Sequence, residues 1–225
     1  MKGQMIDFKG NGESYQGYLS VPASGGPGVI VIQEWWGLND HVKDVCDRFA
    51  VEKFTAFAPD MYKGQKTTSP DEAGKLMMAL NIGEAEKILR GAIQTLLANP
   101  NCTSKTAGVV GFCMGGQLAL YAAATNPDHV SACVDFYGIH PNVKPPFAQM
   151  KAAVLGLFAE RDSFVNAKAV ESLRKVLTAE SKQHEFHVYK GTDHGFFNDT
   201  RPVHHRESAE DAWKRTLALF RNHVK

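Results

Sequence analysis

The chain of 225 residues has few cysteines, no excess of positive charge and no long apolar run. Lys and Arg number 25 against 24 Asp and Glu, so no basic surplus is available to hold phosphates, and nucleic acid is not expected as a partner. No run approaches the roughly 18 apolar residues that a membrane-spanning helix needs, which excludes an integral membrane protein. Metal sites often show Cys-x-x-Cys pairs. The four cysteines, Cys46, Cys102, Cys113 and Cys133, form no such pair.

Signals for export, repeats and linkers are missing as well. Residues 1–8 lack the apolar core of a signal peptide, so we expect a cytosolic protein. No repeat or low-complexity segment interrupts the chain, and its length is sufficient to bury a sizeable core. We therefore predict one domain over residues 1–225, with a monomer as the default state and no membrane partner.

Strand-like and helix-like segments alternate along the chain. This alternation predicts an α/β fold with a mostly parallel central sheet and helices on both faces, a three-layer α/β/α sandwich. The continuous apolar run at 29–33 favours a strand buried on both faces, and Asp40 is the expected N-cap of the first helix. The expected strands are 15–21, 29–33, 54–58, 106–112, 132–137, 153–158 and 184–189. The expected helices are 40–53, 70–80, 84–98, 117–126, 166–179 and 207–223.

One short motif is expected to supply the nucleophile. Gly111-Phe112-Cys113-Met114-Gly115-Gly116 follows an apolar run and opens a helix-like segment, which is the layout of a nucleophile elbow with cysteine as the nucleophile. Glycines two positions to either side allow the strand and the helix to approach closely. We expect Cys113 to be exposed above the sheet at a helix N-terminus, which favours a thiolate or an oxyanion. The alternative is a small buried hydrophobic residue.

An acidic segment and a histidine-containing segment each follow a late strand. Their order, with the acid before the histidine, is the one that an α/β-hydrolase requires. The run 153–158 leads into Ala159-Glu160-Arg161-Asp162-Ser163, and the run 184–189 leads into Gly191-Thr192-Asp193-His194-Gly195-Phe196. Chain order favours Asp162 over Asp193 or Glu160 as the acid, and His194 as the base. In this arrangement the backbone N–H of Met114 would help to bind an oxyanion.

With these motifs, the chain resembles the dienelactone hydrolase family of the α/β-hydrolase fold over nearly its whole length. Gln33-Glu34-Trp35-Trp36-Gly37, after the early strand, belongs to the resemblance. It implies a Cys113–His194–Asp162 triad that hydrolyses a lactone or ester through an acyl-enzyme. It also implies that Glu34 keeps the resting thiol neutral until substrate displaces it, and that the backbone N–H of Trp35 is the second oxyanion donor.

The remaining titratable residues have simpler interpretations. A solvated carboxylate at the end of a strand is the alternative for Glu34, but two neighbouring tryptophans favour a place in the site. Cys46 and Cys133 are expected only to pack, and Cys102 to be incidental. His140 and the pair His204-His205 lack ligand spacing, so we predict no metal and no cofactor.

The family's substrate-binding residues are not all present. The resemblance implies two arginines that grip a substrate carboxylate, but the corresponding positions here are the segment 69–73 and Asn198. Four cations could reach the site, Arg201, Arg206, Lys63 and Lys66, although solvated charges are expected. We predict a largely apolar pocket and a neutral or aromatic small-molecule ester or lactone. The candidates for this pocket are Trp35, Trp36, Tyr62, Met114, Tyr137, Phe164, Phe196 and Phe197.

Three other classes of function use similar residues. A thiol redox protein would want a second cysteine within reach, and none lies within ten residues of Cys113. A binding protein without activity is possible on any fold, but it would have no use for Cys113, Asp162, His194 and Glu34 together. A thioesterase or acyltransferase would use the same triad, and only the acyl acceptor distinguishes it from a hydrolase.

Overall fold

The computed structural model describes residues 2–225 and contains one eight-stranded sheet, in the order β1-β2-β4-β3-β5-β6-β7-β8. The first two strands are antiparallel to their neighbours, and every pair from β4 to β8 is parallel. The strands are β1 (Gln4–Gly10), β2 (Glu13–Ser20), β3 (Gly26–Ile32), β4 (Thr55–Pro59), β5 (Cys102–Phe112), β6 (Val130–Phe136), β7 (Ala153–Ala159) and β8 (His184–Tyr189).

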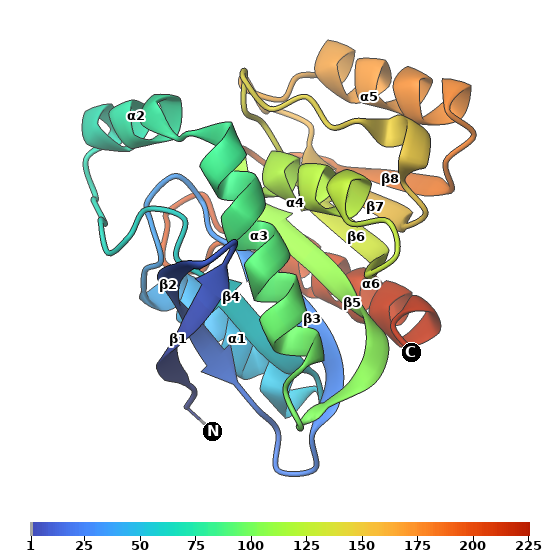
Figure 1. Ribbon diagram of the computed structural model, residues 1–225. Helices are drawn as coiled ribbons and strands as arrows, with labels where there is room; N and C mark the ends of the chain where they lie inside the picture. Colours follow the sequence, from blue (N-terminus) through green and yellow to red (C-terminus); the bar gives the residue numbers. More distant parts are fainter. Residues whose placement is uncertain (1) are drawn as a thin grey trace.

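Helices cover both faces of this sheet (Figure 1). The helix α3 (Ile82–Leu97) packs against β1, β3, β4 and β5, and α4 (Met114–Thr125) packs on β5 and β6. On the opposite face, α1 (Asp40–Val51) contacts β2, β3 and β4, while α6 (Arg206–His223) contacts β6 and β7. The structure confirms the expected α/β-hydrolase architecture with three layers. The remaining helices are α2 (Pro70–Ala79), α5 (Ala167–Ala179) and the short 3₁₀ helix η1 (Phe147–Gln149).

The central strands explain why the apolar runs were informative. Every residue of β4 and β7 is buried, as are Val29 to Ile32 of β3. Because helices cover both faces, side chains on either side of these strands leave water. None of the helices in residues 2–225 combines the length and the apolarity needed to cross a bilayer.

The structure differs from the sequence expectation at one edge of the sheet. The strand β1 was not predicted, because its residues are mostly exposed and few of them are apolar. It pairs with β2 through a hairpin whose turn residues Asn11 and Gly12 have φ of 51° and 89°. An Asn-Gly turn with two positive φ values is a strong hairpin signal. The pair Asn11-Gly12 was therefore the feature of the sequence that could have predicted β1.

Three helix starts also differ, and α4 begins at Met114 rather than at residue 117. Asn39, not Asp40, caps α1, and its side chain accepts the N–H of Val42 at 3.2 Å. Asn81 caps α3 in the same manner, so that helix begins at Ile82 rather than at residue 84. Asparagine is among the best N-caps because its side-chain oxygen satisfies an N–H of the first turn.

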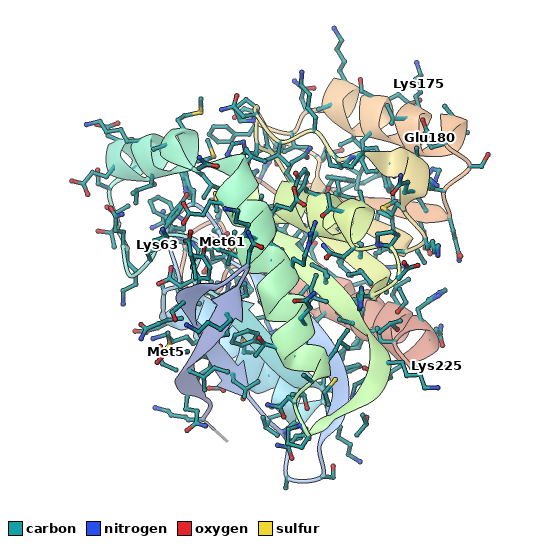
Figure 2. The ribbon with its side chains drawn as sticks, viewed as in Figure 1. Met5, Met61, Lys63, Lys175, Glu180 and Lys225 are labelled. Atoms are coloured by element: carbon teal, nitrogen blue, oxygen red, sulfur yellow. The ribbon has the colours of Figure 1, made fainter. Side chains whose placement is uncertain are left out.

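Figure 2 shows Met61 and Lys63 on the segment between β4 and α2.

Candidate active site

The residues of the predicted site follow the C-terminal ends of the parallel strands. Glu34 lies beyond β3, Cys113 directly follows β5, Tyr137 follows β6, Asp162 lies beyond β7, and His194 lies beyond β8. Because parallel strands end at the same edge of a sheet, residues far apart in sequence meet there. The strand order places β3, β5, β6, β7 and β8 side by side.

The turn at Cys113 has the geometry of a nucleophile elbow. Cys113 has φ 55° and ψ −121° at the start of α4, a conformation that costs of the order of 1–3 kcal/mol for a residue with a side chain. A Cβ on Gly111 would lie 1.8 Å from the carbonyl oxygen of Gly115, and one on Gly115 would lie 2.4 Å from the carbonyl oxygen of Gln33. Glycine is therefore required on both sides of Cys113, as the motif predicts.

Cys113 is less exposed than the sequence suggested. Only 7 % of the residue is accessible, and it packs within the apolar cluster that includes Phe112, Phe136 and Tyr137. The turn that follows β6 covers it: Cys113 N–H donates to the carbonyl of Phe136 at 3.0 Å, and Ile139 N–H donates to the carbonyl of Cys113 at 3.1 Å. A merely packed cysteine does not need a strained backbone, so burial alone does not explain this position.

The structure pairs His194 with Asp162 rather than with the other two candidate acids. Asp162 Oδ2 lies 2.7 Å from His194 Nδ1, and Asp162 Oδ1 accepts the N–H groups of Phe164 at 2.8 Å and Val165 at 2.9 Å. Asp193 instead pairs with Arg161, and Glu160 accepts the N–H of Gly191. Two backbone donors fix the carboxylate, and the carboxylate orients the imidazole.

The charges of this pair stabilise each other. Burial raises the pKa of Asp162, but its hydrogen bonds and the charge of His194 outweigh burial and hold that pKa below the ordinary 3.8. For His194, burial lowers the pKa, yet the hydrogen bonds and charges of Asp162 and Cys113 raise it from 6.5 to about 10. Cys113 belongs to the same apolar cluster as Tyr137, whose ring centroid lies 4.9 Å from that of His194, so the nucleophile and the His194–Asp162 pair lie in one site.

Glu34 lies inside the protein, not in solvent. It is 4 % exposed, and its Oε2 accepts a hydrogen bond of 2.6 Å from Asn198 Nδ2. Asn198 is itself oriented, because its Oδ1 accepts from the backbone N–H of Thr200 at 3.0 Å and from its hydroxyl at 2.6 Å. In residues 2–225, no hydrogen bond joins Glu34 to the Cys113 thiol. The glutamate is thus held by an amide, whereas the resemblance implied a contact with the thiol.

The two expected oxyanion donors lie beside the nucleophile and beside Glu34. Met114 is the first residue of α4, so its N–H has no acceptor within the helix. Its sulfur accepts the hydroxyl of Tyr62 at 3.0 Å, which fixes the side chain at the elbow. Trp35 is half-buried beside Trp36, with ring centroids 5.1 Å apart.

The predicted apolar pocket is not assembled as one cavity. Of the candidates, only Trp36 borders the cavity of about 610 Å³ at this edge of the sheet, and the other eight residues that line this cavity have polar side chains. Phe196 and Phe197 are buried because they complete the core: Phe197 stacks on Phe112 with ring centroids 5.1 Å apart. Phe164, by contrast, is 56 % exposed and lies beside His194. The cavity is lined by Trp36, Asn39, Asp40, Lys66, Thr67, Thr68, Asn198, Thr200 and Arg201.

The four cations considered from the sequence divide into two groups. Arg201 and Lys66 line the cavity of about 610 Å³, and the guanidinium of Arg201 lies 4.1 Å from the ring centroid of Trp36. Lys63 pairs instead with Glu84 of α3, and Arg206 pairs with Glu210. The first two are therefore wall residues of the cavity.

Comparison with known proteins agrees with this geometry. The model of the dienelactone hydrolase family matches residues 15–224. The chain belongs to the dienelactone hydrolase family. It is 39% identical to "Protein usf" of Aquifex pyrophilus, with 99% of each chain covered, and 35% identical to a "Putative carboxymethylenebutenolidase" of Aquifex aeolicus (strain VF5), with 99% of this chain and 100% of the other covered.

A solved structure supports the same assignment. The crystal structure of a "Putative Dienelactone Hydrolase" from Klebsiella pneumoniae is 30% identical and has a TM-score of 0.87, with 98% of this chain and 99% of the other covered. This dienelactone hydrolase family member is therefore a hydrolase with the α/β-hydrolase fold.

Two polar residues near this family site received no role from the sequence. Asn198 was noted only as the position where an arginine was missing, and its bond to Glu34 is a contact across 164 residues. Asp135 lies in β6, is fully buried, and has no hydrogen-bond partner for either carboxylate oxygen among residues 2–225. Its signal was a carboxylate inside the otherwise apolar segment 132–137.

Proposed function

We propose that this hydrolase cleaves the ester bond of a lactone or an activated aryl or enol ester through an acyl-enzyme on Cys113. The observation that carries the proposal is the alignment of Asp162, His194 and the strained elbow cysteine. Asp162 lies 2.7 Å from His194, and the pKa of His194 is raised to about 10 although burial opposes it, because of hydrogen bonds and charges from Asp162 and Cys113. A histidine with a raised pKa is a stronger base toward the thiol proton.

The reaction would proceed in two halves. His194 takes the thiol proton, the Cys113 sulfur bonds to the carbonyl carbon, and the backbone N–H groups of Met114 and Trp35 hold the oxyanion. Collapse breaks the ester C–O bond, and His194 gives its proton to the departing oxygen. His194 then takes a proton from water, whose oxygen bonds to the thioester carbonyl carbon. The C–S bond breaks to release the acid, and His194 returns the proton to the Cys113 sulfur.

The nucleophile limits the kind of substrate. A thiolate attacks readily but also leaves readily, so the adduct returns to substrate unless the alcohol or enolate is a good leaving group. Activated esters and enol lactones meet this requirement, and amides do not. We expect slow turnover of unactivated amides, and efficient cleavage of a simple peptide would contradict the proposal.

We further propose that the substrate needs no carboxylate of its own. The position where the family's second arginine was expected is Asn198, which bonds Glu34 through a neutral amide. The cavity wall next to it carries Lys66 and Arg201, but the Arg201 guanidinium lies 4.1 Å from the ring centroid of Trp36, and the carboxylate of Asp40 lines the same wall and would repel a substrate carboxylate. A neutral aryl ester is therefore expected to react at least as well as a dienelactone.

Turnover of phenyl acetate and of a dienelactone tests the proposal. Wild type is compared with Cys113→Ala and with Cys102→Ala, a half-buried cysteine outside the site. We expect activity to disappear in the first variant and to persist in the second, and mass spectrometry to find the acyl group on the Cys113 peptide. Activity that survives in folded Cys113→Ala would refute the cysteine mechanism. A folded wild type that is inactive on both esters would favour a transferase or a binding protein.

A further inference from the structure

Tyr137 has a polar group that the structure leaves unused. Its side chain is fully buried, and its hydroxyl has no hydrogen-bond partner among residues 2–225. A buried polar group without a partner destabilises the fold, and phenylalanine would fill the same space without that cost. Such a group in a native protein requires an explanation.

The backbone of Tyr137 is strained and tied to the elbow. Its φ is 42°, in the left-handed region that residues with side chains rarely adopt. Two hydrogen bonds connect Phe136, the preceding residue, and Ile139, two residues further on, to the backbone of Cys113. The N–H of Tyr137 itself donates to the carbonyl of Leu157 at 2.9 Å. The position of the ring is therefore coupled to the position of the nucleophile.

The surroundings of the Tyr137 hydroxyl are the charged groups of the site. The ring centroid lies 4.9 Å from that of His194. Burial, followed by the charges of Glu34, Cys113 and Asp162, raises the pKa of the Tyr137 hydroxyl well above 10, and the nearby Phe197 N–H, which can only donate to the hydroxyl oxygen, offsets this only in part. The hydroxyl thus keeps its proton and can act only as a neutral donor. The groups that face it come from the ends of four different strands, β3, β5, β7 and β8.

We infer that Tyr137 is a further catalytic residue, whose hydroxyl donates to the negative charge on the Cys113 sulfur. This rests on Cys113 being the nucleophile. The hydroxyl has no acceptor while the thiol is neutral, and a deprotonated Cys113 sulfur would supply one. A donor that is already in place when charge develops stabilises that charge without reorganisation.

Alkylation of Cys113 by iodoacetamide, measured across pH, tests this assignment without any ester turnover. The modified peptide is quantified by mass spectrometry, which separates Cys113 from the other three cysteines. The midpoint is the pH at which the alkylation rate of Cys113 is half-maximal, and we expect Tyr137→Phe to raise it by about one pH unit. At pH values below the midpoint, the variant should therefore be alkylated about tenfold more slowly than wild type. The melting temperature of this variant should equal or exceed that of wild type, because the unpaired hydroxyl is gone.

Tyr18→Phe is the matched control. Tyr18 is also a buried tyrosine, but its hydroxyl bonds the carboxylate of Asp47 at 3.1 Å, far along the chain from the elbow. This variant should melt at a lower temperature and keep the wild-type alkylation profile. An unchanged profile in folded Tyr137→Phe would overturn the assignment, whether or not esters are hydrolysed.

Two further variants decide which group the hydroxyl serves. In a Glu34→Gln background, Tyr137→Phe should produce the same shift of the midpoint. If the shift vanishes there, the hydroxyl acts on the Glu34 carboxylate, and the assignment to the sulfur is wrong. Replacing Tyr137 with 3-fluorotyrosine, a stronger donor of the same shape, should move the midpoint in the opposite direction, and a shift in the same direction as Tyr137→Phe would count against the assignment.

Discussion

Replacing Asp135 with Asn should change how the stability of this hydrolase depends on pH. Asp135 lies in β6 below the elbow, and its carboxyl packs against main chain: a Cβ on Gly116 would lie 2.3 Å from its Oδ1, and one on Gly138 would lie 2.1 Å from it. Burial raises the pKa of Asp135 from 3.8 to about 7, and the nearby Gly138 N–H and the charge of His194 offset this only in part.

The size of the effect follows from this shift. A group whose pKa is higher in the folded state stabilises the fold fully below its unfolded pKa, and this contribution is lost as pH rises through its folded pKa. The interval from 3.8 to about 7 corresponds, at about 1.36 kcal/mol per unit, to about 4 kcal/mol. The amide introduced by Asp135→Asn does not titrate, so the variant should lack this loss.

Urea unfolding at pH 4 and at pH 8 measures the difference. The free energy of unfolding of Asp135→Asn minus that of wild type should rise by about 4 kcal/mol between these two values, most of it between pH 4 and pH 7. Because both proteins share all other titrating groups, the difference isolates Asp135. A constant difference across this range would show that Asp135 is ionised in the folded protein and would refute the reasoning.

Three other substitutions test the site. Asp162→Asn should lower kcat about a thousandfold or more without unfolding the protein and should lower the pKa of His194 from about 10; an NMR titration showing no change in that pKa would contradict the pairing. Gly111→Ala should abolish activity and lower the melting temperature, since its Cβ would lie 1.8 Å from main chain, whereas Gly83→Ala, which meets nothing closer than 3.4 Å, should be harmless in the same melting assay. Phe164→Ala should raise KM for an aryl ester about fivefold through lost apolar contact, and an unchanged KM in steady-state kinetics would remove this exposed ring from the substrate site.

The arrangement of the helices and strands was largely predictable from the sequence. Apolar runs identified β3 and β7 because strands covered on both faces bury every side chain. The edge strand β1 could not be found in this way, since most of its residues face solvent. Its hairpin signal was the pair Asn11-Gly12.

The sequence by itself determined the order of nucleophile, acid and histidine and the need for glycine around Cys113. Both are local: the elbow depends on backbone sterics within six residues, and the order depends on which strand each residue follows. Chain order also favoured Asp162, and the hydrogen bond of 2.7 Å to His194 agrees with it.

Only the tertiary structure decided which distant groups meet. The hydrogen bond between Glu34 and Asn198 joins two loops 164 residues apart, and no pattern in either loop predicts it. The aromatic residues near the ends of the motifs looked alike in sequence, yet Phe164 is exposed beside His194 while Phe197 is stacked in the core. Side-chain type limits what a residue can do, but burial and partners depend on how the strands place the loops that follow them.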